Sequence, residues 1–428
     1  MTLASKLLLA AAIGALAAPA TAQPIPPAVQ KRIDRILKAT PLIDGHNDLA
    51  EQVREHRNMS VEGLARDTDK LQPDPMMTDI ARLRQGRVGG QFWSVYIDAS
   101  VHGDEAIRQT LEQIDIIGRF AKAYPKDIEL ASTADDFVRI HRRGKIASVV
   151  GVEGGHQIGG SMAALRQFYR LGARYMTLTH FATNDFADSA TDDPKWGGLN
   201  DFGVAVVHEM NRIGMLVDLA HVSPDTMKDA IAASKAPVIF SHSNARAIED
   251  HPRNVPDDVL ALLPANGGVV MVNFYTGYLS EPFRQWNALH AAEEARLKTL
   301  FTGQPDKRDA GLKEWEAAHP KPVGDIGLLA DHIDHIVKVA GHDAVGLGGD
   351  LDGIPYDESI QGMNSVSGYP LIFAELIRRG WSDKDLAKLA GGNILRVLRR
   401  AEAVSASMKD EPPSMAVLPP PPPAKKAD

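Results

Sequence analysis

The chain of 428 residues contains no cysteine. This absence excludes a disulfide framework, thiolate metal ligands and a lipid-modified cysteine after an amino-terminal signal. Any bound metal ion must therefore be held by histidine, aspartate and glutamate. The sequence also lacks a basic stripe, because its formal charge is -8 and its lysines and arginines are scattered. Nucleic acid is therefore not an expected partner, and a small molecule or peptide is favoured.

The amino-terminal segment has the features of a secretory signal. Lys6 precedes an apolar core at residues 7–18, and Ala20-Thr21-Ala22 forms a small-residue cleavage site before Gln23. The core is too short to span a membrane. We predict a signal peptide at residues 1–22, a linker and helix at 23–40, and a mature protein that is exported to a periplasm or secreted without a membrane anchor. An uncleaved anchor is the alternative.

The carboxyl-terminal segment is rich in proline. It contains Pro412-Pro413 and a run of five prolines at residues 419–423, which favour an extended, polyproline-like course without packing. We predict a disordered tail at residues 406–428.

Between these ends, short apolar runs alternate with amphipathic segments over residues 41–405. The expected strands are residues 42–44, 91–97, 146–152, 175–178, 215–219, 238–240, 269–273 and 344–347. The expected helices are residues 29–38, 105–123, 162–171, 202–213, 224–233, 256–263 and 326–339. Eight strand–helix units, and the absence of the Gly-x-Gly-x-x-Gly turn of a dinucleotide fold, favour an α/β fold of the (β/α)8 TIM-barrel type over an open sheet. Residues 279–323, after the seventh strand, are expected to form a helical insert.

Polar side chains follow six of the eight expected strands. They are His46, Asp48, Glu153, His180, His221, His242 and Asp350. In a (β/α)8 barrel these positions meet at one face, where catalytic residues are assembled. The set exceeds the needs of one tetrahedral zinc, whereas two metal ions that share a carboxylate fit it. Two divalent ions about 3.5–4 Å apart hold a bridging water and polarise a carbonyl, which favours amide hydrolysis.

Four other histidines are weaker candidates. His332 and His335 alternate with isoleucines on an expected helix, so we interpret them as surface or packing residues. His156 lies in a glycine-rich loop and His251 precedes a proline. His156 is expected to be structural, with a supporting role around the metal ligands as the alternative. His251 is expected to be either structural or supporting, and not a ligand.

From residue 41 to about residue 398 the sequence resembles the membrane dipeptidase (renal dipeptidase) family of zinc metallopeptidases. The matching motifs are Asp44-Gly45-His46-Asn47-Asp48, Gly90-Gln91-Phe92-Trp93-Ser94-Val95-Tyr96, Gly151-Val152-Glu153-Gly154-Gly155-His156, Leu178-Thr179-His180, Val217-Asp218-Leu219-Ala220-His221-Val222-Ser223, Phe240-Ser241-His242-Ser243, Arg253-Asn254-Val255-Pro256-Asp257, Asn273-Phe274-Tyr275 and Gly348-Gly349-Asp350-Leu351-Asp352-Gly353. Their order along the chain makes the resemblance specific.

The resemblance implies a centre of two zinc ions with Glu153 as the bridging ligand. His46 and Asp48 would complete the first ion's ligands, and His221 and His242 those of the second. Cobalt or manganese would fit the same side chains.

The resemblance also implies roles in binding and catalysis. Arg253, helped by Tyr278, would bind the substrate carboxylate, and His180 would contact the substrate near the reacting carbonyl. Asp350 would carry the proton. The expected activity is the hydrolysis of free dipeptides, with L- or D-residues at the second position, by a hydroxide that bridges the two zinc ions.

Two alternatives remain at this stage. A related metal-dependent amidohydrolase would use the same centre on a cyclic amide, a lactone or a β-lactam. A non-catalytic binding protein would have no use for Asp350 as a proton carrier. Animal members of the family carry disulfides and a lipid anchor, and this chain is expected to have neither. A covalent dimer and a membrane tether are therefore not expected, whereas a non-covalent homodimer remains open.

Overall fold

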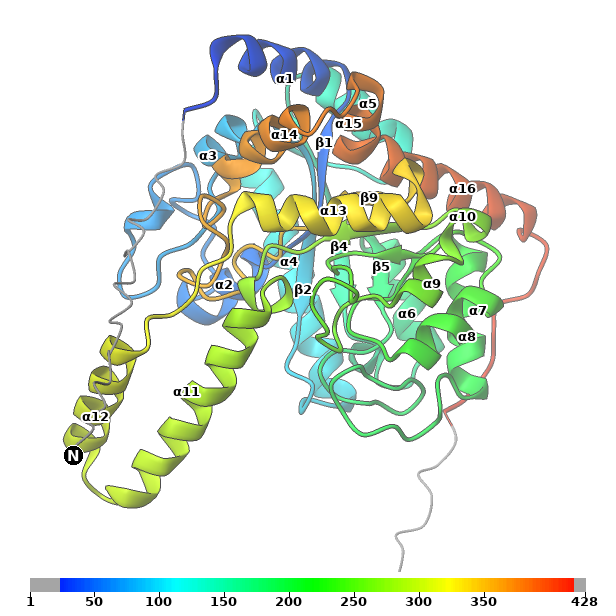
Figure 1. Cartoon of the computed structure of the whole chain (residues 1–428). Helices are drawn as coiled ribbons and strands as arrows, with labels where there is room; N and C mark the ends of the chain where they lie inside the picture. The colour runs from blue at the N-terminus through cyan, green and yellow to red at the C-terminus, as the bar shows by residue number, and fades with distance from the viewer. Residues whose placement is uncertain (1–23, 419–428) are drawn as a thin grey trace, which may run out of the picture.

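A closed parallel barrel of eight strands forms the centre of the computed structural model, which describes residues 24–418 (Figure 1). The barrel strands are β1 (Leu42–Asn47), β2 (Val88–Tyr96), β4 (Ile146–Glu153), β5 (Ala173–Thr177), β6 (Leu216–Asp218), β7 (Ile239–Phe240), β8 (Val269–Val272) and β9 (Val345–Leu347). They pair in the order β2-β1-β9-β8-β7-β6-β5-β4, and the parallel pairing of β2 with β4 closes the ring. The predicted (β/α)8 barrel is confirmed.

The barrel strands are almost entirely buried, as parallel strands covered by helices must be, and only Tyr96 of β2 and Arg174 of β5 are half-buried. Every residue of β1 and of β4 is buried. The sequence prediction missed β3 (Ile128–Leu130), a short additional strand that pairs with the beginning of β4. Only one of its three residues is buried, so its apolar signal is weak.

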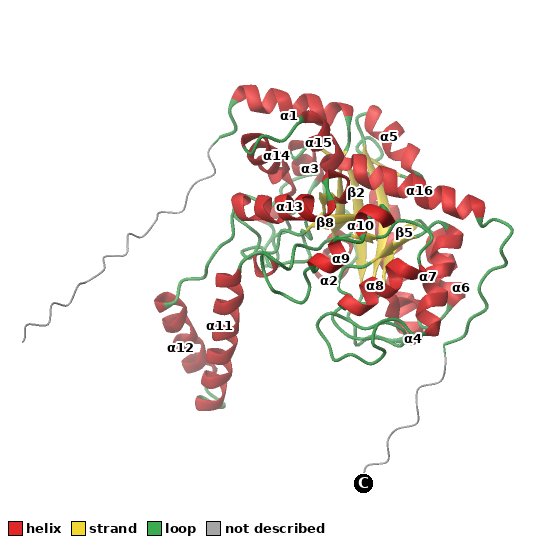
Figure 2. Cartoon of the chain, turned by 45° about the vertical axis from the view of Figure 1, so that its right-hand side comes forward, coloured by secondary structure: helices red, strands yellow, loops and turns green. Residues whose placement is uncertain are grey.

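Helices surround the barrel and cover its ends (Figures 1 and 2). Their bounds are α1 (Pro27–Ala39), α2 (Leu49–His56), α3 (Ile80–Gln85), α4 (Gly103–Ala123), α5 (Ala134–Arg142), α6 (Met162–Arg170), α7 (Asp201–Ile213), α8 (Pro224–Ala233), α9 (Asp257–Leu260), α10 (Leu263–Asn266), α11 (Glu281–Leu300), α12 (Pro305–Ala318), α13 (Ile326–Ala340), α14 (Tyr369–Arg378), α15 (Asp383–Ala387) and α16 (Asn393–Ser407). The helix expected at 256–263 is divided into α9 and α10. Pro264 lies at the start of α10, where its missing N–H cannot extend the first helix.

The insert after β8 is helical, as predicted. Helices α11 and α12 form a hairpin that projects away from the barrel (Figures 1 and 2). Trp286 and Trp315 face each other across it, with ring centroids 5.9 Å apart. The Trp286 indole N–H donates to the carbonyl of His319 at 2.7 Å. These contacts join the two helices at the barrel end of the hairpin.

The segment after α16 is packed as far as the structure describes it, which corrects the expectation of a tail without packing. The backbone N–H of Ser414 donates to Glu209, and Arg166 donates to the Ser414 carbonyl, both at 3.1 Å. Leu418 lies against Gly160. The predicted signal peptide and the five-proline run fall outside the described residues. Within residues 24–418, no helix is both long and apolar enough to cross a membrane.

Candidate metal and substrate site

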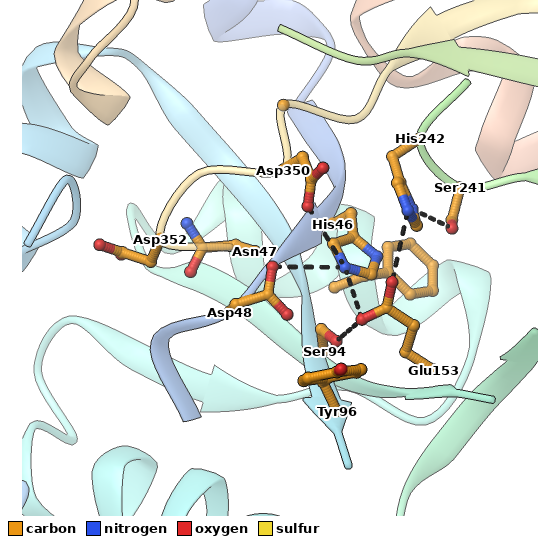
Figure 3. A network of polar contacts seen from close by, with 12 residues as sticks. His46, Asn47, Asp48, Ser94, Tyr96, Glu153, Ser241, His242, Asp350 and Asp352 are labelled. Carbon is orange, nitrogen blue, oxygen red and sulfur yellow. Dashed lines mark hydrogen bonds and ion pairs between the residues drawn. The ribbon is translucent and has the colours of Figure 1, made fainter. Parts of the chain in front are cut away.

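The carboxyl ends of the barrel strands bring the predicted side chains together (Figure 3). His46 is the next-to-last residue of β1, and Glu153 is the last residue of β4. The remaining four, His180, His221, His242 and Asp350, lie in the loops that follow β5, β6, β7 and β9. All are buried, as is Asp48 directly after β1.

Glu153 is the centre of this cluster. Its Oε1 lies 3.0 Å from His221 Nε2 and 3.4 Å from His242 Nε2. Its Oε2 lies 3.3 Å from His46 Nε2 and accepts a hydrogen bond from the Ser94 hydroxyl at 3.1 Å. The two oxygens therefore face different histidines, which is the arrangement that a bridging carboxylate requires.

The donor atoms fit divalent metal ions. His46 Nε2 and both carboxylate oxygens of Asp48 are buried without a hydrogen-bond partner among the described residues, a state that costs about 1–3 kcal/mol per group. The Nε2 atoms of His221 and His242 lie 2.9 Å apart, so their lone pairs point to one region. Nitrogen and carboxylate donors without sulfur suit zinc and similar borderline ions.

The described chain contains three overlapping groups of donors. Within each group, the donor atoms lie within 4.8 Å of one another. The groups are His46 with Glu153 and His242, Glu153 with His180 and His221, and His46 with Asp48 and Asp350. They contain every side chain that the sequence predicts as a metal ligand. His180 and Asp350, which the resemblance places outside the ligand set, lie within the same reach.

Burial and neighbouring charges shift the pKa values of the histidines. Burial opposes the rise at His46, but Tyr175, Glu153 and Asp48 raise its pKa well above the ordinary value. Burial lowers the pKa of His180, His221 and His242 well below the ordinary value, and the positive charge of Arg253 lowers each of them further. The three imidazoles are therefore neutral and keep a lone pair for a metal ion. In contrast, burial raises the pKa of Asp350 to about 8 in the metal-free chain.

Two site residues have a backbone conformation that side chains rarely adopt. The φ angle is +68° at His221 and +60° at Asp350. Such left-handed residues cost about 1–3 kcal/mol each and persist where the surrounding structure holds them. In this conformation His221 Nε2 lies 3.0 Å from Glu153 Oε1, and Asp350 Oδ1 lies 3.8 Å from His46 Nε2.

Hydrogen bonds orient the donors from behind. The Ser241 hydroxyl lies 2.8 Å from His242 Nδ1 and donates to Asp218 Oδ2 at 2.6 Å. The Tyr175 hydroxyl lies 2.9 Å from His46 Nδ1. Because these contacts occupy the Nδ1 atoms, both rings direct Nε2 toward the cluster.

We predict that Ser241→Ala weakens metal affinity roughly 10- to 100-fold, because His242 loses its orienting contact. Competition between the protein and a chelator for Zn²⁺ measures this affinity. Ser148→Ala is the matched control, since that buried hydroxyl on β4 has no hydrogen-bond partner among residues 24–418. Equal affinities of the two variants would contradict the role of Ser241.

Arg253 and Tyr278 lie together beside the cluster. The guanidinium of Arg253 is 5.2 Å from the centre of the Tyr278 ring and donates to the His242 carbonyl at 3.3 Å. Arg253 is only 1% exposed, and no contact within residues 24–418 satisfies its Nε. No carboxylate of the described chain pairs with this buried cation, so residues 24–418 leave it without a counter-charge.

A cavity of about 280 Å³ opens onto the cluster. Its lining residues are Asp48, Glu51, Tyr96, Glu153, His180, Phe181, His221, Tyr275, Tyr278, Asp350, Gly353, Ile354 and Pro355. Sequence reasoning did not single out Glu51, Phe181 or Ile354. For Glu51 a signal exists, because it follows Asp48 by three residues at the start of a helix, where this spacing places two side chains on one face.

The four weaker histidines stand apart from the donor groups. His332 is buried rather than on the surface, between the Ala245 N–H and the Leu279 carbonyl, so its packing interpretation is the correct one. His335 pairs with Asp257 at 2.8 Å. His156 contacts the Ile97 carbonyl at 3.1 Å.

His251 lies beside Tyr278 and Arg253, which agrees with the supporting role that was one of its two expected interpretations. Its ring packs on Tyr278, with centroids 4.8 Å apart, and its Nδ1 accepts from the Arg253 N–H at 3.1 Å. It therefore supports the two residues beside the cluster without facing the cluster itself.

The chain is similar to known dipeptidases in both sequence and structure. Residues 30–412 match the family model described as membrane dipeptidase, peptidase family M19. The chain is 40% identical over 401 residues to an uncharacterised dipeptidase of Schizosaccharomyces pombe, covering 90% of this chain and 86% of that protein. It is also 40% identical over 387 residues to dipeptidase VerJ of Clonostachys rogersoniana, covering 88% of each. The solved structure of the probable dipeptidase PvdM from Pseudomonas aeruginosa matches with a TM-score of 0.73 and 25% identity, over 89% of this chain and 100% of that one.

Proposed function

This chain belongs to the membrane dipeptidase family, peptidase family M19, and is a metallodipeptidase. We propose that it uses two bound zinc ions to hydrolyse free dipeptides. The observation that carries the proposal is the convergence of buried imidazole and carboxylate donors on Glu153, beside an unpaired Arg253. The cavity of about 280 Å³ suits a substrate of two residues.

In this proposal Glu153 would be shared by the two ions. His46 and Asp48 would hold one, and His221 and His242 would hold the other. When bound, the ions activate a water molecule and polarise the peptide carbonyl. The chain supplies ligands already oriented by Ser241 and Tyr175, so little reorganisation is needed when the ions bind.

Arg253 and Tyr278 bind the free carboxylate of the substrate. A guanidinium presents two parallel N–H donors to a carboxylate, and its burial strengthens the pairing. The Tyr278 ring supports the guanidinium from one side and lines the cavity. Anchoring the carboxylate at this depth limits the substrate to one residue beyond the reacting bond.

His180 and Asp350 act on the reacting bond itself. Both line the cavity, and His180 Nε2 lies 3.6 Å from Glu153 Oε1. His180 contacts the carbonyl oxygen as negative charge develops on it. Asp350 accepts a proton from the attacking water and returns it to the leaving amine. Its Oδ2 accepts from Asn273 at 2.7 Å, which leaves Oδ1 free for this transfer.

The experiment that tests the function is hydrolysis of a panel of dipeptides with L- or D-residues at the second position, by protein of defined zinc content. We expect cleavage of free dipeptides, much slower cleavage of C-terminally blocked ones, loss of activity on chelation and recovery with zinc. A protein that holds two metal ions but cleaves no dipeptide would move the assignment to a cyclic amide, a lactone or a β-lactam.

Arg253→Ala is expected to lower kcat/KM for free dipeptides roughly 10- to 100-fold, the loss of a charged hydrogen-bonded contact. C-terminally amidated dipeptides, which lack the carboxylate, should change little. Arg253→Lys keeps the charge without the two-pronged geometry, so its kcat/KM for free dipeptides should lie between those of the wild type and Arg253→Ala. Equal losses on free and amidated substrates would remove Arg253 from carboxylate binding.

We also propose that the protein is exported, on the basis of the amino-terminal segment. Amino-terminal sequencing of the protein recovered outside the cytoplasm is expected to begin at Gln23. Recovery with Met1 intact would support the uncleaved anchor instead.

A further inference from the structure

Glu51 is a carboxylate in the cavity that none of the proposed roles uses. It lies in the first turn of α2 and lines the same cavity as Asp48, Glu153 and Asp350. Within residues 24–418 its carboxylate has no ion pair or hydrogen bond. Burial and the negative charges of Asp48, Glu153, Glu55 and Asp350 raise the pKa of Glu51 to about 9, so a cation placed in the cavity would stabilise its ionised form.

The charges of a bound dipeptide show what this carboxylate would face. A free dipeptide carries one carboxylate and one ammonium at neutral pH. Arg253 would pair with the carboxylate of the dipeptide. Metal ions would neutralise the charges of Asp48 and Glu153, and Asp350 would carry the proton that is transferred in the reaction. An ammonium brought close to two divalent ions needs a counter-charge of its own. Glu51 is the lining carboxylate that remains for it.

The cavity wall adds to this preference. Tyr96 and Phe181 line the cavity, and their rings lie 4.4 and 4.2 Å from the ring of His180. Aromatic faces attract a nearby cation, including the ammonium or guanidinium of a ligand. Phe181 is 48% exposed, which places it where the cavity meets solvent.

We propose that Glu51 binds the positive charge of the substrate's first residue, either its free amino group or a basic side chain. This role rests on the proposed dipeptidase function and makes Glu51 a determinant of specificity. It explains why a helix that begins at the metal site directs a carboxylate into the cavity.

The test is Glu51→Gln, which keeps the shape of the side chain and removes its charge. Three compounds separate the possibilities: Ala-Ala, Arg-Ala, and propionyl-alanine, which has the carboxylate but no amino group and serves as a competitive inhibitor. We expect kcat/KM for Arg-Ala to fall roughly 10- to 100-fold, with an unchanged inhibition constant for propionyl-alanine and unchanged zinc content.

The behaviour of Ala-Ala then identifies the charge that is bound. A loss on Ala-Ala equal to that on Arg-Ala assigns the amino group, and a loss confined to Arg-Ala assigns the basic side chain. Unchanged kcat/KM on both dipeptides, an equal weakening of propionyl-alanine, or a loss of zinc would each overturn the proposal.

Glu55→Gln is the matched control, because Glu55 lies one turn further along α2 and pairs with Arg54. It should leave all three compounds unaffected. Failure of the dipeptidase function is a separate outcome, visible in the wild-type protein as zinc binding without cleavage. In that event, calorimetry with Ala-Ala and Arg-Ala decides the role of Glu51, since weaker binding to Glu51→Gln supports it and equal binding refutes it.

Discussion

Asp350→Asn is expected to lower kcat by roughly 10²- to 10⁴-fold, the usual contribution of a positioned acid–base group, while both metal ions stay bound. The amide has the shape of the carboxylate and can still accept the hydrogen bond that Asn273 donates at 2.7 Å. It cannot take a proton from water at neutral pH. Steady-state kinetics on a free dipeptide and metal analysis of the same sample measure the two quantities.

Asp352→Asn provides a matched control for this variant. Asp352 lies two residues away, is also buried, and has a φ angle of +69°. Its side chain points away from the histidines in Figure 3 and accepts from the Met77 N–H at 2.6 Å. We expect nearly full kcat. If Asp350→Asn instead loses metal, Asp350 is a ligand within the group that contains His46 and Asp48.

Glu153→Gln is expected to have the largest effect, with dipeptide hydrolysis falling to background and metal content falling below two ions per chain. The substitution keeps the volume but removes the charge that faces His46, His221 and His242. One oxygen is replaced by an N–H₂ group, which has no lone pair for a metal ion. Metal analysis after dialysis against a defined zinc concentration measures the loss.

Thermal unfolding gives an independent measure of the same change. A ligand at about 1,000 times its Kd stabilises the folded state by about 4 kcal/mol, so wild-type Tm should rise when zinc is added to the metal-free protein. Glu153→Gln should lose most of that rise. Glu209→Gln is the control, because Glu209 is equally buried but pairs with Arg166 and Arg212. A full zinc-dependent rise in Glu153→Gln would exclude Glu153 as the shared ligand.

The barrel could be predicted because its signals are local. Strand and helix periodicities alternate along the chain, and strands buried on both sides are mostly apolar, as β4 is apart from Ser148 and Glu153. Short or partly exposed elements escaped prediction, since the signal of β3 is only three residues long. The packed course of residues 411–418 escaped because proline content reports local stiffness and not the contacts that Ser414 and Leu418 make with distant helices.

The sequence by itself determined which polar side chains gather at one face of the barrel. His46, Glu153 and Asp350 are recognisable because each follows an apolar run, and parallel strands of one barrel must end at the same face. Which atoms face one another was decided by the tertiary structure. The opposed oxygens of Glu153, the contact between Ser241 and Asp218, and the unpaired carboxylate of Glu51 depend on strand register and loop conformation. These features join residues far apart in the chain, so no local pattern encodes them.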